Sequence, residues 1–134
     1  MATKDQGEHT FAEDLLISGE ELRGYTASEA LSRGEPVAIT GNYEVSPATD
    51  GGPFVGIVLY DVESGEEVAL AGDDCEVRIE ASAALDAGDA ITPDGAGAFR
   101  QAGAGETVGV TNEGIGLNEW GQAYLSATTG TESA

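Results

Sequence analysis

A short unit recurs along this chain, consisting of a glycine, an acidic residue, one variable residue and an aliphatic residue. It occurs at residues 19–22, 34–37, 65–68, 88–91 and 105–108. The glycine permits a turn that other residues resist, the acid stays solvated, and the aliphatic residue starts an inward-facing strand. A chain divided in this way favours short strands and tight turns, and it disfavours long helices.

The centre of the predicted domain is the stretch 54–81. Residues 54–61 are apolar at nearly every position, which predicts a strand that is buried on both faces. After a Ser-Gly turn comes a short run at 67–70. A third run alternates, with three residues facing inward: Cys75, Val77 and Ile79. Three runs separated by turns predict a β-meander.

A longer pattern relates the two halves of the chain. Residues 31–35, followed by 55–57, resemble residues 85–89, followed by 108–110. The matching order predicts an internal duplication. The alternative is that any glycine-rich acidic β-protein produces such matches by chance.

Charge is the strongest compositional signal. The 134 residues include 25 Asp and Glu against 5 Lys and Arg, a net charge of −20, and Lys4 is the only lysine. Self-repulsion of this size destabilises a compact state in dilute buffer, and molar salt screens it. We therefore expect a protein adapted to high salt. The alternative, an ordinary acidic protein, more often concentrates its acids in a tail.

The same balance limits the partners. Binding to nucleic acid or to an anionic membrane surface requires basic clusters, and the sequence has none. No apolar run approaches the length of a transmembrane helix, and no secretory signal is recognisable. The single Cys75 rules out an internal disulfide and is expected to be a core residue.

Catalytic and cofactor patterns are weak. The only histidine, His9, lies near the N-terminus, so a base-assisted nucleophile is not expected. Adjacent acids such as Asp73 and Asp74 are typical of solvated turns. One cysteine and one histidine are too few for zinc, and no EF-hand spacing occurs. A biotinyl or lipoyl carrier needs a lysine at a hairpin tip, which Lys4 does not provide. We expect no enzyme, no metal and no cofactor.

The sequence divides into an N-terminal arm at 1–18, a β-domain at 19–127 and a polar tail at 128–134. The arm has two interpretations, a frayed terminus or a segment that orders on a partner.

The order of motifs resembles the capsid cement, or head decoration, proteins of tailed viruses, the group that includes the lambda-type decoration protein. The resemblance covers residues 25–127 and is carried by 31–37, 54–61, 64–70, 85–92 and 108–110. It implies an all-β fold, a small Gly-rich β-barrel or β-tulip-like domain with short strands, a flexible N-terminal arm and little helix. The acid load departs from bacteriophage examples and favours a virus of a halophilic archaeon.

The resemblance also implies a function. Such proteins are non-enzymatic, form trimers on the outer surface of an icosahedral capsid, and cement neighbouring subunits of the major capsid protein. The arm would supply the capsid-binding residues, which are Lys4, Phe11, Leu15, Leu16 and Ile17. The alternative is a host β-barrel module of a halophilic archaeon that acts in adhesion or ligand binding.

Overall fold

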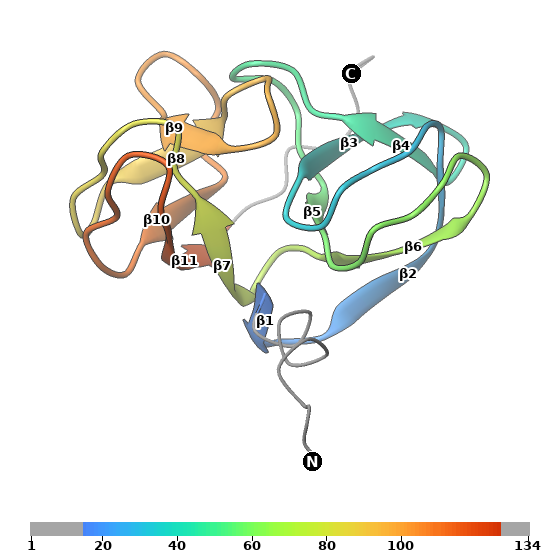
Figure 1. Cartoon of the computed structure of the whole chain (residues 1–134), viewed down its shortest axis with the longest axis horizontal. Coiled ribbons are helices and arrows are strands. Elements are labelled where there is room, and N and C mark those ends of the chain that lie inside the picture. The colour runs from blue at the N-terminus through green and yellow to red at the C-terminus, as the bar shows by residue number, and fades with distance from the viewer. Residues whose placement is uncertain (1–14, 127–134) are drawn as a thin grey trace.

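The computed structural model describes residues 15–126, which form eleven β-strands and no helical element. Figure 1 shows two compact groups of strands side by side, β2–β6 in one and β7–β11 in the other. The all-β, barrel-like fold predicted from the sequence is confirmed. The strands are β1 (Leu16–Ser18), β2 (Glu21–Ala27), β3 (Pro36–Gly41), β4 (Glu44–Pro47), β5 (Gly56–Val58), β6 (Glu67–Ala71), β7 (Glu76–Glu80), β8 (Ala90–Pro93), β9 (Phe99–Gln101), β10 (Gly109–Thr111) and β11 (Trp120–Leu125).

The two groups share one strand order. The first is a closed barrel, β2-β4-β3-β5-β6, in which β2 pairs in parallel with β4 and antiparallel with β6. The second is a sheet, β1-β7-β11-β10-β8-β9. A parallel bridge from Ala81 to Phe99 joins the β7 and β9 sides, as the parallel pair Ala27 and Val45 joins β2 to β4. The second group therefore repeats the first, with β1 added beside β7.

Backbone hydrogen bonds between loops show the same repeat. Leu31 and Val62 exchange two N–H···O bonds of 3.0 Å in the first group. Leu85 and Ile115 exchange bonds of 2.8 and 2.9 Å at the matching place in the second. The turn before β3 thus corresponds to the turn before β8, and β5 corresponds to β10. The repeat predicted from the sequence is confirmed as a repeat of geometry.

The acidic residues of the recurring unit do more than face water. In three of the five units, the carboxylate accepts a backbone N–H from three positions earlier and so closes its own turn. The glycine of each turn has φ between 87° and 90°, in the left-handed region that disfavours other residues. The bonds are Ser32 N–H to Glu35 Oε1 (3.0 Å), Glu63 N–H to Glu66 Oε1 (2.8 Å) and Asp86 N–H to Asp89 Oδ2 (2.8 Å).

A fourth turn at residues 116–119 completes the pattern without a glycine at the left-handed position. Asn118 occupies that position with φ 62°, which asparagine tolerates better than most residues. The N–H of Glu119 donates to the carbonyl of Gly116 at 3.0 Å. Each group therefore has two such turns. A sequence pattern that requires glycine does not identify the turn at residues 116–119.

The predicted β-meander is wrong in its third strand. β5 and β6 pair as an antiparallel hairpin, but β7 belongs to the other sheet, between β1 and β11. The free side of β6 pairs with β2, which closes the barrel and leaves no edge for β7. The chain crosses between the groups at 72–74, where Asp74 has φ 70° and its N–H bonds the carbonyl of Leu125 at 2.8 Å.

One hydrophobic core joins both groups. Phe54, which precedes β5, and Phe99 of β9 are fully buried and meet edge to face, with ring centroids 6.0 Å apart. The alternation predicted for 75–81 is confirmed, because Cys75, Val77 and Ile79 are buried in this core. A smaller cluster fills the first barrel, with Val37, Val45, Val58, Val68 and Leu70 among its members.

Two glycines at matching positions are required by close backbone approach. A Cβ on Gly109 would lie 2.5 Å from the carbonyl oxygen of Tyr124, and a Cβ on Gly56 would lie 2.6 Å from that of Ala71. We expect Gly109→Ala to lower the free energy of unfolding by about 1–3 kcal/mol, since a backbone oxygen cannot rotate away. Urea denaturation in molar salt measures the change.

The control for that prediction is Gly114→Ala. A Cβ there meets nothing closer than the carbonyl oxygen of Leu85 at 3.7 Å. This variant should unfold within about 0.5 kcal/mol of the parent protein. Equal destabilisation by both substitutions would contradict the role assigned to Gly109.

Candidate functional site: the cleft between the barrels and the outer surface

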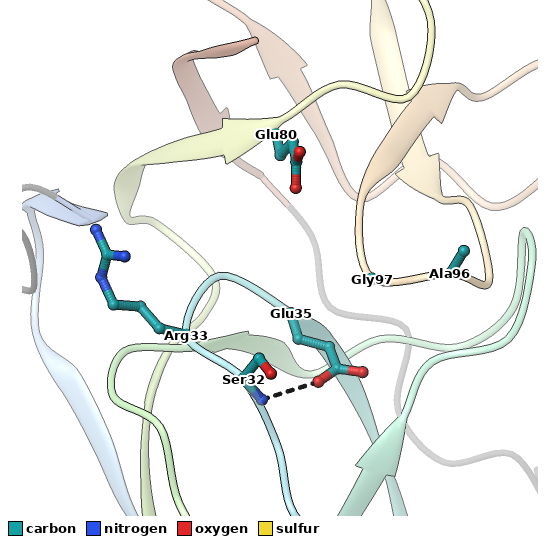
Figure 2. Close-up of a pocket in the computed structure, with 6 residues that line it drawn as sticks. All are labelled: Ser32, Arg33, Glu35, Glu80, Ala96 and Gly97. Atoms are coloured by element: carbon teal, nitrogen blue, oxygen red, sulfur yellow. Dashed lines mark hydrogen bonds between the residues drawn. The ribbon is translucent and has the colours of Figure 1, made fainter. Parts of the chain in front are cut away.

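A polar cleft of about 250 Å³ lies between the two groups of strands. Figure 2 shows its sides, with Ser32 and Glu35 on the turn before β3, Glu80 at the end of β7, and the loop that carries Ala96 and Gly97. Arg33 also lines the cleft, and its side chain extends away from Glu35. The cleft is thus formed where one repeat faces the other.

Trp120 determines how closely the repeats approach here. It begins β11 and pairs with Glu80 of β7. A Cβ on Gly34 would lie 2.5 Å from the Cη2 atom of the indole, so the ring lies directly against the turn of the first barrel. The ring remains 41% exposed. Trp120 therefore forms one wall between the repeats and also contributes to the outer surface.

The charged side chains that line the cleft come from both groups of strands, Arg33 and Glu35 from the first and Glu80 from the second. One oxygen of Glu35 is occupied by the Ser32 N–H within its own turn. Across residues 15–126, no three Asp, Glu, His or Cys side chains are grouped to hold a metal ion. The acids at Asp73, Asp74 and Glu113, which would line a deep polar pocket in an enzyme, are exposed and do not line this cleft.

Cys75 behaves as a core residue. It is buried, and its Sγ lies 3.6 Å from the carbonyl oxygen of Glu20. Burial raises the pKa of the Cys75 thiol above its usual value, which reduces the reactive thiolate at neutral pH. Nearby, the hydroxyl of Tyr124 donates to Asp74 Oδ1 at 2.9 Å, and this bond raises the pKa of Tyr124.

The structure places the predicted capsid-binding residues in different environments. Lys4 and Phe11 lie outside the described residues. Leu15 is fully buried in the shared core, and Leu16 pairs with Val77 as part of β1. Ile17 is 38% exposed. The end of the predicted arm is thus part of the body, because residues 16–18 form β1 of the sheet and Leu15 fills the core. The body therefore begins before the predicted residue 19, and Leu15 is not free to contact a partner.

Besides Ile17, several large apolar side chains lie on the surface that the sequence did not identify as binding candidates. Tyr43 is the most exposed, at 71%. Its position directly after Gly41 and Asn42, two residues typical of tight turns, is the signal that could have identified it. The exposed set comprises Ile17, Leu22, Tyr43, Tyr60, Leu117, Trp120 and Tyr124.

No helix among the described residues is long and apolar enough to cross a membrane. No protein-family model matches the chain, and no curated protein matches it. Among solved structures, the chain resembles the N base of the head fiber gp8.5 of bacteriophage phi29, with a TM-score of 0.64 and 15% sequence identity. The similarity covers 82% of this chain and 98% of that one. At this identity the comparison establishes a shared fold.

Proposed function

We propose that this protein is a structural component of a virion that binds the outer surface of an icosahedral capsid and cements neighbouring major capsid subunits. The observation that carries the proposal is that the fold, a closed barrel beside a six-stranded sheet, is shared over most of both chains with the base of a phage head fiber. A head fiber base is, by its name, a part associated with the phage head. The shared fold covers 98% of that chain.

The charge of the chain supports an outer location. A protein with net charge −20 is repelled by packaged nucleic acid, so its favourable position is on the side of the shell away from the genome. The proposal assigns no reaction to the chain. It includes a trimer and a virus of a halophilic archaeon, which rest on the resemblance noted in the sequence and on the acid excess.

The body offers a means of attachment besides the arm. With Leu15 in the core, contact by the described residues falls to exposed side chains, of which Tyr43 is the most exposed large apolar one. Whether residues 1–14 add to this contact, as predicted for Lys4 and Phe11, stays a prediction.

Electron cryomicroscopy of intact virions tests the proposal. We expect density for a β-barrel linked to a second β-sheet on the outer shell, at three-fold or quasi-three-fold positions. Virions whose outer surface carries no copy of this chain would refute capsid cementing. In that case a host adhesion or ligand-binding module would be the remaining interpretation, and isolation of the protein from uninfected host cells would support it.

A further inference from the structure

The barrel carries a pair of tyrosines beside its β3–β4 hairpin, here called the Tyr25–Tyr43 rim. Tyr25 at the end of β2 and Tyr43 before β4 lie with ring centroids 6.0 Å apart and planes inclined by 46°. Tyr25 is half-buried against the barrel core, and Tyr43 covers its outer side. The hairpin between β8 and β9, which matches the hairpin between β3 and β4, has Gly95, Ala96 and Gly97 at its tip. The matching loop of the second group, at residues 94–98, is longer and carries no aromatic residue.

Tyr43 is held in an unfavourable backbone conformation. Its φ of 52° lies in the left-handed region, where a bulky side chain is uncommon and glycine or asparagine is preferred. Its carbonyl accepts the N–H of Thr26 at 2.8 Å, which fixes the tip against β2. A tyrosine that is strained and also 71% exposed contributes little to the core. Its position is better explained by a contact outside the chain.

Two acids flank the rim. Thr26 pairs with Glu44 on β4 and with Glu67 on β6, so both acids lie in one row across the outer face of the barrel. Glu67 Oε2 also accepts the N–H of Gly24, next to Tyr25, at 3.3 Å. Within residues 15–126, neither Glu44 nor Glu67 forms an ion pair. Glu44 directly follows Tyr43, so the exposed ring of Tyr43 lies next to an outer row of acids that no basic side chain of residues 15–126 pairs with.

We propose that the Tyr25–Tyr43 rim is the docking point for an arginine or lysine side chain on an extended segment of a different protein. A cation placed over a tyrosine face is attracted by the ring, and the two carboxylates add to this attraction. Charge complementarity argues against a second copy of this chain, because each copy carries −20. As the attachment point of the proposed cementing role, this assignment rests on the proposed function.

Binding to purified shells stripped of this protein, followed by sedimentation in molar salt, tests the rim. We expect Tyr43→Gly to weaken binding roughly ten-fold, the size of a well-formed cation–π contact. We expect Tyr43→Phe to bind within about two-fold of the parent, since the ring remains. Tyr43→Leu should behave as Tyr43→Gly. Full binding by Tyr43→Leu would overturn the proposal, because it would show an apolar contact in place of an aromatic one.

The matched control is Asn118→Gly, which also relieves a left-handed residue, with φ 62°, but lies on the second repeat. It should bind shells as the parent does. Tyr43→Gly should unfold at or above the temperature of the parent, since glycine suits the backbone there. Equal loss of binding in both variants would overturn the assignment to the rim.

A second experiment does not need shells. The peptides acetyl-Gly-Arg-Gly-amide and acetyl-Gly-Leu-Gly-amide are titrated against the full chain while NMR signals of the tyrosine rings are followed. We expect the arginine peptide alone to shift the signals of Tyr25 and Tyr43. If the parent protein does not bind shells but the arginine peptide still shifts these signals, the cementing role is refuted. The assignment of the rim as a site for a cationic side chain then stands. Equal response to both peptides would refute the rim.

Discussion

Phe99→Ala should lower the free energy of unfolding by about 3–5 kcal/mol, even in molar salt. Phe99 is fully buried and meets Phe54 of the other repeat edge to face. Truncation of a buried phenylalanine costs about 3–5 kcal/mol, against a total stability of about 5–15 kcal/mol for a domain. Circular dichroism during urea denaturation measures the loss. Tyr60→Ala, at a residue that is 44% exposed, is the control and should change stability by less than about 1 kcal/mol.

The same substitution tests whether the two repeats fold as one unit. Phe54 belongs to the first repeat and Phe99 to the second, yet both lie in one core cluster. A single cooperative transition should therefore persist in each variant. A double-mutant cycle of Phe54→Ala and Phe99→Ala should yield a coupling of about 0.5–1.5 kcal/mol, the range for aromatic pairs. Two separate transitions, one for each barrel, would contradict a shared core.

The sequence predicts local structure well because the signals for turns are local. Glycine followed by an acid marks three turns whose geometry depends only on four consecutive residues, as in Ser32 to Glu35. Burial of 54–59 and the alternation after Cys75 follow from side-chain period alone. Even the repeat is recoverable, because matching turns need matching residues.

A strand can pair with a segment far away in the chain, and local sequence patterns do not identify that partner. Nothing in residues 67–81 states that β6 will pair with β2, forty residues earlier, and leave β7 to pair with β1 and β11. The sequence also places Leu15 in the arm, because this apolar residue follows a polar N-terminal segment. Only the assembled sheet shows that Leu15 fills the core. The Tyr25–Tyr43 rim depends on both a turn conformation and a strand pairing.

The second large expected effect is the dependence of thermal stability on salt concentration. Subtracting the 5 basic residues from the 25 acids leaves 20 carboxylates without a possible basic partner. Within residues 15–126, the two ion pairs with defined geometry are Arg23 with Glu21 and Arg100 with Asp50, at 2.8 and 2.7 Å. Charges on so small a body lie within the screening length of about 10 Å at 0.1 M salt but beyond the roughly 3 Å at 1 M. Repulsion therefore acts across the surface only in dilute buffer.

We expect the thermal unfolding midpoint to fall by roughly 10 °C when salt is lowered from about 1 M to 0.1 M, which corresponds to about 2–3 kcal/mol for a chain of this length. The triple variant Glu20→Gln, Glu29→Gln, Glu106→Gln removes three exposed acids, none of whose carboxylates bonds another described residue, and should show a smaller loss. An unchanged midpoint at low salt would mean that unpaired carboxylates do not destabilise this fold, and adaptation to brine would lose its physical basis.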